Sequence, residues 1–277
     1  MSSTIAPEIY FAAVGDVHGH MHAMVRVLSG WEASTRNSLS FVVQVGDFEP
    51  IRYEDDLNSM AVPAKYRAIG DFPDFFNGRA TFPWPVYFIG GNHEPYGLLD
   101  AIPEGGRVIH HCTYVGRAGV IEAGGLRIAG LSGIFLAEAF ERRRPRLEDL
   151  GKTSKKEFTY FRKEDVDRVA GFDSIDILVV HEWPDGVIAP EDADEFENIR
   201  RSSRYDAVGN EYARLLMEVL EPRLVLCGHM HKRYHNRIRL ESGKIVDVRC
   251  LAHMGMGRDA ISIYRIAQDG SIVEVWP

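Results

Sequence analysis

The stretch IYFAAVGDVH, residues 9–18, is a short apolar run that ends in glycine, aspartate and histidine. Its length and its aromatic and β-branched residues are typical of a buried strand, and the glycine marks the end of that strand. Asp16 and His18 are two positions apart in an extended segment, so their side chains face the same way. The stretch therefore predicts a strand that delivers a carboxylate and an imidazole to one edge of a sheet.

The same arrangement recurs four times along the chain. Short apolar runs end in metal-ligand residue types at Phe41–Val45 before Gly46-Asp47, at Val86–Ile89 before Gly90-Gly91-Asn92-His93-Glu94, at Ile177–Val180 before His181, and at Leu224–Cys227 before Gly228-His229-Met230-His231. Ligands of open α/β sheets gather at the carboxyl ends of strands. We therefore expect the five strand ends to converge on one crevice.

The collected residue types indicate a centre of two metal ions. Carboxylates, an amide and several imidazoles suit Mn, Fe or Zn, because Mg and Ca prefer an all-oxygen shell. In two-metal hydrolases the ions lie about 3.5–4 Å apart, so one ligand must reach both. Asp47 is the predicted bridge, because it stands alone in its motif. His229 and His231 have the same spacing as Asp16 and His18, so they can serve neighbouring ions.

His93 has a different predicted role. It must point away from the direction taken by Asn92 if Asn92 binds metal, which leaves an imidazole beside the ions. Such a group can supply a proton to a leaving alkoxide and stabilise its developing charge. Among the other histidines, we expect positions at the surface or behind the metal ligands for His20 and His22, and loop positions for His110, His111 and His235. For His253 a loop position and a place in the site both stay open.

Composition indicates an ordinary globular protein of 277 residues, with 45% hydrophobic and 26% charged residues. The number of strand-like runs favours two sheets, and helical spacing appears at His20–Trp31 and Tyr205–Leu220. The chain contains no apolar stretch of the roughly 18 residues that a spanning helix needs, and no leader-like start. We expect one α/β domain over residues 1–277, located in the cytoplasm, with no membrane contact.

The charge of the chain is unevenly distributed. The net charge is −8, which makes the protein a poor non-specific binder of nucleic acid. From Arg142 to Lys163, however, nine basic residues stand against three acidic ones. A solvated loop face and a phosphate-facing role are both open for this segment. We treat residues 137–163 as a basic, substrate-facing insertion, and the candidate substrate-binding residues are Arg142, Arg143, Arg144, Tyr96 and Trp183.

Together, the five motifs resemble those of the calcineurin-like metallophosphoesterases. The resemblance covers essentially the whole chain and implies a four-layer α/β/β/α sandwich of two mixed sheets with flanking helices. It implies one metal site made by Asp16, His18, Asp47 and His231, and a second made by Asp47, Asn92, His181 and His229. It also implies that His93 is the acid or transition-state contact.

Within that superfamily, several segments look similar to the RNA lariat debranching enzymes. They are Met60–Arg67, Phe88–Glu94, Tyr114–Val120, Gly130–Phe135 and His181–Pro184. By position, the basic insertion corresponds to the loop that this family uses to recognise branched RNA. The chain departs from the family at Asp16, where the debranching enzymes carry cysteine, and a harder oxygen ligand implies a different metal preference.

The predicted function is a phosphodiesterase that depends on two divalent ions, in which a bridging hydroxide attacks phosphorus and His93 assists the leaving group. RNA with branched or 2′–5′ linkages is the expected substrate. One alternative is a phosphomonoesterase or phosphoprotein phosphatase with the same ions, although Gly46-Asp47 lacks the Asp-Arg-Gly continuation of the latter. The other is a non-catalytic RNA-binding module, which would have no need of His93.

Overall fold

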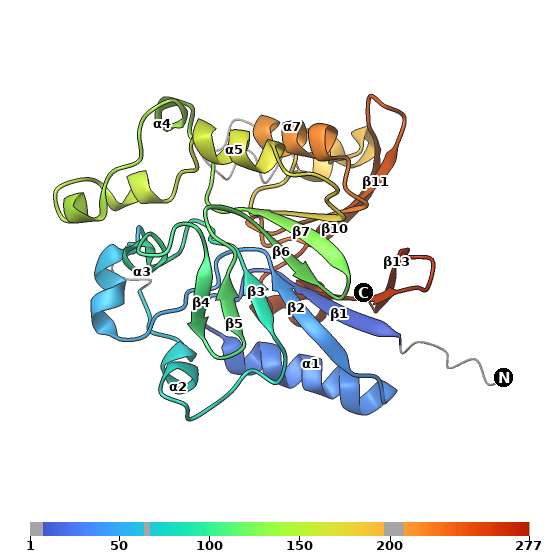
Figure 1. Ribbon diagram of the computed structural model, residues 1–277, viewed down its shortest axis with the longest axis horizontal. Coiled ribbons are helices and arrows are strands. Elements are labelled where there is room, and N and C mark those ends of the chain that lie inside the picture. Colours follow the sequence, from blue (N-terminus) through green and yellow to red (C-terminus); the bar gives the residue numbers. More distant parts are fainter. Residues whose placement is uncertain (1–7, 64–66, 197–207, 277) are drawn as a thin grey trace.

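The computed structural model describes residues 8–63, 67–196 and 208–276, which form two mixed β-sheets between layers of helices (Figure 1). The first sheet has the strand order β13 (Ile272–Trp276), β12 (Ile261–Ile266), β1 (Ile9–Val14), β2 (Leu39–Gln44), β3 (Val86–Phe88), β5 (Cys112–Tyr114) and β4 (Gly106–Ile109). The second has the order β10 (Tyr234–Arg239), β11 (Ile245–Cys250), β9 (Leu224–Cys227), β8 (Ile177–Val180), β7 (Leu126–Leu131) and β6 (Ala118–Ala123).

Helices cover the outer face of each sheet. Helices α1 (Met21–Thr35) and α2 (Phe72–Phe76) lie on the first sheet, and α5 (Lys163–Ala170) and α7 (Glu211–Leu220) lie on the second (Figure 1). The connections hold the short helices α3 (Tyr96–Leu99) and α4 (Ala137–Phe140) and the 3₁₀ segments η1 (Glu54–Ser59), η3 (Leu147–Asp149), η4 (Lys155–Phe158), η5 (Pro190–Asp192) and η6 (Met254–Ala260). None of these described helices combines the length and apolar character that crossing a membrane requires.

The alternation of side chains along β1 shows how the layers are held. Phe11 and Ala13 join the core between the two sheets, whereas Ala12 and Val14 pack in the same cluster as residues of α1 such as Leu28. Successive side chains of a strand point to opposite faces, so a strand buried on both faces reads as a continuous apolar run. The predicted four-layer α/β/β/α sandwich is therefore confirmed.

Parallel pairing places many strand ends at one edge. Strands β1, β2, β3 and β5 run parallel in the first sheet, and β7, β8, β9 and β11 run parallel in the second. All five strand ends that carry ligand motifs belong to these two sets. Strand β11 adds a sixth strand end, beside β9, and it leads into the segment that contains His253.

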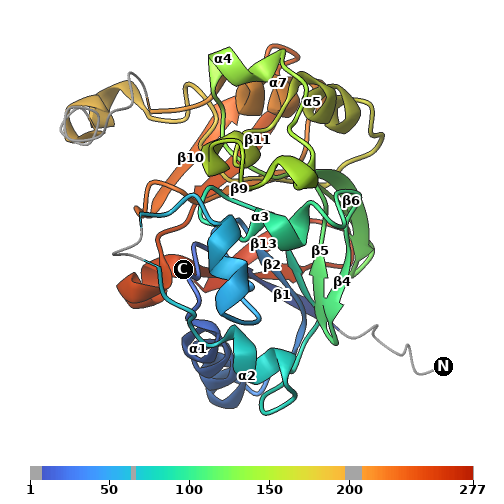
Figure 2. The same cartoon turned by 90° about the vertical axis from the view of Figure 1, so that its left-hand side faces the viewer.

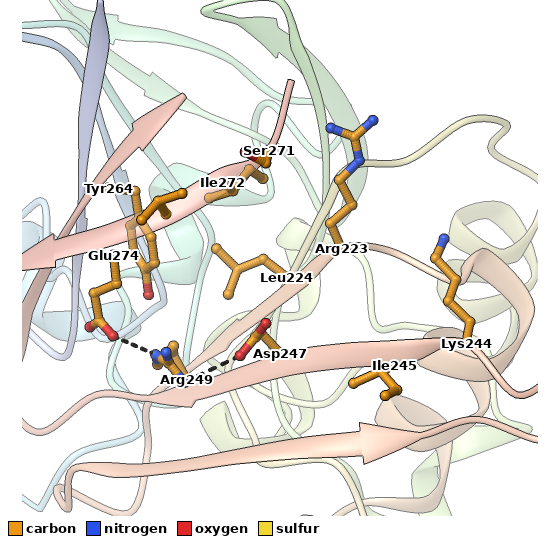
Figure 3. Close-up of a pocket in the computed structure, with 11 residues that line it drawn as sticks. Arg223, Leu224, Lys244, Ile245, Asp247, Arg249, Tyr264, Ser271, Ile272 and Glu274 are labelled. Atoms are coloured by element: carbon orange, nitrogen blue, oxygen red, sulfur yellow. Dashed lines mark hydrogen bonds and ion pairs between the residues drawn. The ribbon is translucent and has the colours of Figure 1, made fainter. Parts of the chain in front are cut away.

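At the amino ends of β9 and β11, ion pairs join the two sheets around a cavity of about 530 Å³. Figure 3 shows Arg249 of β11 between Asp247 and Glu274, and its Nε lies 2.9 Å from Glu274 of β13 in the other sheet. Glu274 also accepts a bond from Arg233 at 2.9 Å. The polar side chains around Glu274 therefore tie the two sheets together.

Several local predictions differ from the structure. His235 lies in β10, not in a loop, because its strand pairs with β11 at the edge of the sheet. Strand β4 was not predicted, since Gly106–Ile109 is short and only partly apolar. The helix predicted from Tyr205 is described from Glu211 onward, where Asn210 caps it; residues 205–207 lie outside the described residues. Residues 64–66 of the Met60–Arg67 segment also lie outside them.

Candidate metal centre

The first group of predicted ligands meets where β1, β2 and β9 end. Ligand atoms of Asp16, His18, Asp47 and His231 all lie within 4.8 Å of one another. Nε2 of His18 is 3.0 Å from Nε2 of His231, which is 3.2 Å from Oδ2 of Asp16. Nε2 of His18 is 3.9 Å from Oδ2 of Asp47. Four side chains from three strand ends therefore surround one point and could hold a cation.

A second group lies on the other side of Asp47. Nε2 of His181 is 3.5 Å from Oδ1 of Asp47 and 3.2 Å from Oδ1 of Asn92. The rings of His181 and His229 lie 5.0 Å apart. Asp47 thus turns Oδ2 to the first group and Oδ1 to the second, which is the geometry of a bridging carboxylate.

The spacing of these atoms fits shared metal ions. Two ligand atoms about 2.1 Å from one ion lie about 3.0 Å apart at a right angle and about 3.4 Å apart in a tetrahedron. The separations of 3.0, 3.2 and 3.5 Å agree with this range. Two carboxylates, one amide and four imidazoles are also a donor set for borderline transition metals. The residues present therefore fit two divalent ions.

Hydrogen bonds orient two of the imidazoles toward these positions. Nδ1 of His181 lies 2.9 Å from the carbonyl oxygen of Val45, which can only accept, so Nδ1 carries the hydrogen. Nδ1 of His18 likewise donates to Oε1 of Glu49 at 2.9 Å. Each bond leaves Nε2 as the ligand atom, the arrangement that usually orients metal-binding histidines. Glu49 was not among the predicted site residues; its position two residues after Asp47 was the available signal.

The buried charges perturb one another strongly. Burial opposes protonation of His181, but Asp47, Asp16 and the carbonyl of Val45 together raise the pKa of His181 to about 10. Burial likewise opposes protonation of His18, yet Glu49 and Asp47 raise its pKa to about 9. Burial and the neighbouring His181 lower the pKa of His229 to about 3. Without metal, protons on His18 and His181 compensate the buried carboxylates, and a cation can take over that role.

Glycines in the motifs provide the space that the ligands occupy. A Cβ on Gly91 would lie 2.2 Å from Oδ1 of Asp47, and one on Gly228 would lie 2.1 Å from Oδ1 of Asp16. Neither position tolerates a side chain without moving a ligand. The glycines therefore belong to the geometry of the site as well as to the ends of the strands.

The loops that present the ligands have unusual backbone conformations. Positive φ angles occur at His18 (46°), Asp47 (53°), His229 (68°) and His231 (54°). Left-handed backbone is uncommon for residues other than glycine and is found at sites where the surrounding structure enforces it. This geometry turns the ligand side chains inward directly after β1, β2 and β9.

A second carboxylate outside the predicted set, Glu94, joins two of the loops. It is fully buried and accepts N–H bonds from Phe48 (2.8 Å), Glu49 (2.9 Å) and Gly91 (3.2 Å). Burial and the charge of Asp47 raise its pKa to about 8, while the N–H groups of Phe48 and Glu49 oppose this. Glu94 fixes the loop after β2 to the loop after β3, and therefore Asp47 to Asn92.

His93 lies outside the first group, although ligand atoms of His93, His18 and Glu49 also lie within 4.8 Å of one another. Its ring is 5.2 Å from that of His18, and its side chain is 37% exposed. Nδ1 of His93 is 3.8 Å from Oε1 of Glu49, and its backbone N–H donates to Oδ1 of Asp47 at 2.7 Å. The imidazole is therefore held at the open side of the centre, where a substrate can reach it.

Two predicted substrate residues are placed inside the protein. Tyr96 is fully buried and donates its hydroxyl to the carbonyl of Gly91 at 2.6 Å. Trp183 is 1% exposed and donates Nε1 to the carbonyl of Gly228 at 2.7 Å. These positions contradict a role for either side chain in contacting substrate. Both support glycines of the ligand loops instead.

The three predicted arginines separate into two kinds. Arg144 pairs with Asp165 and donates to the carbonyl of Tyr160, so its charge is used within the protein. Arg142 is 57% exposed and lies 3.7 Å from Glu157, and Arg143 is exposed. Part of this segment packs on α3, since a Cβ on Gly97 would lie 3.4 Å from Leu150, whereas Arg142 and Arg143 lie beside Lys163 and Glu164 of α5. Figure 2 shows α3 and α4 on the same side of the molecule.

Comparisons with known proteins agree with this geometry. Residues 9–233 match the family model described as calcineurin-like phosphoesterase. The chain is 32% identical over 231 residues to the lariat debranching enzyme of Entamoeba histolytica, which covers 82% of this chain and 65% of that protein. The corresponding enzyme of Saccharomyces cerevisiae is 31% identical over 241 residues, covering 84% and 59%. That of Danio rerio is 30% identical over 270 residues, covering 92% and 47%.

The chain thus spans about half to two thirds of the length of these relatives. The family match, by contrast, includes all five ligand motifs and most of both sheets. The chain belongs to the calcineurin-like phosphoesterase family.

Proposed function

We propose that the protein is a phosphodiesterase that uses two divalent metal ions. The observation that carries this proposal is the position of Asp47, which turns one carboxylate oxygen to each of two ligand groups. His93 stands beside them without belonging to either. A binding module would have no use for a paired site with a free imidazole at its open side.

Two groups of residues, which share Asp47, would hold the ions. Asp16, His18, Asp47 and His231 would hold the first ion, and Asp47, Asn92, His181 and His229 would hold the second; Mn, Fe or Zn suits this donor set. When bound, two such ions supply a nucleophile at neutral pH and neutralise phosphoryl oxygens.

His93 acts on the leaving group. Its half-exposed ring can reach the departing oxygen and donate a proton, which prevents that oxygen from leaving as a strong base. Glu49 orients the ring of His18 by a hydrogen bond, and the same oxygen lies 3.8 Å from Nδ1 of His93. Glu94 keeps the two loops in register while substrate binds and product leaves.

The substrate that we propose is RNA with a branched or 2′–5′ linkage. The curated relatives are named lariat debranching enzymes, and the similarity extends over more than four fifths of this chain. Arg142 and Arg143 are exposed and line a hollow with Lys163 at the start of α5, and Leu150 of the same segment lies beside Gly97 of α3. Cations at this position can contact phosphates of a strand that leaves the centre.

The deciding experiment uses manganese-loaded protein and two matched oligonucleotides, one with a 2′–5′ branch and one with 3′–5′ linkages only. Cleavage at the branch alone supports the proposal, and an Asp47→Asn variant gives the inactive baseline. Cleavage of both would support a phosphodiesterase without linkage selectivity. Failure on both, with rapid hydrolysis of 4-nitrophenyl phosphate, would replace the proposal with a phosphomonoesterase.

A further inference from the structure

The loop after β11 brings one more histidine to the metal centre. Strand β11 is parallel to β9, with Cys250 opposite Cys227, so its end lies beside the loop of His229 and His231. The N–H of Met254 donates to the carbonyl of Asp16 at 2.8 Å. A Cβ on Gly15 would lie 1.9 Å from the carbonyl oxygen of Ala252. The segment that holds His253 is therefore packed directly on the first ligand motif.

The ring of His253 stands next to the first group of ligands and outside it. Its centroid is 4.7 Å from that of His231 and 6.5 Å from that of His18. Among the described residues, the ligand atoms within 4.8 Å of one another belong to Asp16, His18, Asp47 and His231, or to His18, Glu49 and His93, and His253 is in neither group. The imidazole is half-buried and lies at the edge of the centre.

A backbone bond fixes which nitrogen can donate. Nδ1 of His253 accepts the N–H of Gly255 at 3.2 Å and caps the start of η6. Because a backbone N–H can only donate, the neutral ring carries its hydrogen on Nε2. Gly255 makes room for the ring, since a Cβ there would lie 2.6 Å from Cε1 of His253. The ring of His253 therefore has one N–H donor, on Nε2, and the bond of Nδ1 with Gly255 fixes its orientation at the edge of the centre.

Two imidazoles that are not ligands thus flank the centre, His93 beside His18 and His253 beside His231. A phosphodiester has two ester arms, one that leaves and one that stays on phosphorus, while its phosphoryl oxygens go to the ions. The leaving arm belongs to His93 in the proposed function. The Nε2 donor of His253, on the far side of His231, is then available to the arm that stays on phosphorus.

Resting on that proposed function, we infer that His253 binds the nucleoside arm that stays on phosphorus, through a hydrogen bond from Nε2 to an ester or ribose oxygen. A phosphomonoester lacks that arm when its only ester bond is the one that breaks. His253 is thus a specificity-determining residue that favours nucleotide diesters over simple monoesters.

The test compares two substrates with the same leaving group, the 4-nitrophenyl ester of a nucleoside 5′-phosphate and 4-nitrophenyl phosphate. In manganese-loaded His253→Ala, kcat/KM for the nucleotide ester should fall about tenfold, the size of one lost hydrogen bond, and that for the monoester less than about twofold. Bound metal, measured by mass spectrometry, should stay at the wild-type amount.

A matched variant separates substrate binding from the cap of η6. His253→Asn keeps an acceptor for the N–H of Gly255, because asparagine caps well, but has no donor at the position of Nε2. Its kcat/KM for the nucleotide ester should fall as far as that of His253→Ala. Met256→Ala, at an exposed position of η6, should leave both rates unchanged. Recovery of activity in His253→Asn, or an equal loss on both substrates, would overturn the inference.

A binding measurement decides the inference even without turnover. Calorimetry with adenosine 5′-monophosphate and with inorganic phosphate should show about tenfold weaker nucleotide binding in His253→Ala and unchanged phosphate binding. Equal nucleotide affinity in variant and wild type would refute the role of His253 and leave the proposed function standing. Loss of a metal ion would instead make His253 a ligand. Absence of turnover in the wild type would count against the proposed function alone.

Discussion

Gly91→Ala changes one methyl group and tests the geometry of the whole centre. The new Cβ would lie 2.2 Å from Oδ1 of Asp47 and 2.6 Å from Nε2 of His181, whereas real Cβ contacts essentially never fall below 3.0 Å. Oδ1 must therefore move by the difference between 2.2 and 3.0 Å, about 0.8 Å. Metal–ligand distances tolerate only about 0.2 Å. Asp47 can then no longer serve both groups.

The expected result follows from that displacement. Overpacking of this kind costs about 1–3 kcal/mol of unfolding free energy, which is less than the total stability of about 5–15 kcal/mol, so the variant should fold. A displacement near 1 Å costs about 100-fold in kcat/KM, or about 2.7 kcal/mol of transition-state stabilisation. The variant should also retain fewer than two ions per chain after dialysis.

The assay measures metal content, kcat/KM on a phosphodiester, and thermal unfolding of the same preparation. Gly30→Ala is the matched control, since a Cβ there meets nothing within 4 Å and lies in α1. It should keep both ions and full activity and gain about 0.5–1 kcal/mol of stability. Two ions and wild-type kcat/KM in Gly91→Ala would refute the close approach of Gly91 to Asp47.

Three further predictions concern His93 as the acid, the protons that metal binding displaces, and the basic segment. His93→Ala should keep its metal ions and lose about 10²- to 10⁴-fold in turnover, and a loss of metal would show that His93 is a ligand. The pKa values of about 9 for His18 and about 10 for His181 mean that both are protonated at pH 7 without metal. Metal binding must displace these protons, so the affinity for metal should rise from pH 6 to pH 8. Calorimetry in buffers of different ionisation enthalpy should detect the released protons. A metal affinity that does not change with pH would contradict the protonation of these histidines. Arg143→Ala should weaken RNA binding and reduce the salt slope by about 1 at unchanged stability, whereas Arg144→Ala should lower the unfolding free energy by about 2 kcal/mol and leave the salt slope as it is.

Much of the fold could be predicted because its signals are local. Strands β1, β8 and β9 were predicted with their observed bounds, since each is an apolar run that ends at a glycine or a polar ligand type. Strand β10, at the edge of the second sheet, was missed because its residues alternate between partly or fully buried and exposed positions, whereas the residues of β1 after Ile9 are all buried.

The roles of the charged and aromatic residues near the centre were harder to predict. Arg144 and Arg143 are neighbours of the same type, yet one pairs with Asp165, 21 residues away, and the other is exposed. Tyr96 follows a ligand motif but turns into the core. A side chain's direction depends on neighbours that are distant in sequence, and residue type alone does not identify those neighbours.

The sequence by itself determined the five motif strands and the set of residues that meets at their ends, whereas the layered sandwich was implied by the resemblance to the family. The sequence could do so because strand periodicity and the residues that directly follow a strand are local properties, and parallel strands necessarily end at one edge. Only the tertiary structure decided that Asp47 faces both groups, that Glu94 joins two loops, and that His253 stands at the rim. These relations join positions up to more than 200 residues apart, and the packing of the two sheets brings them within a few ångströms.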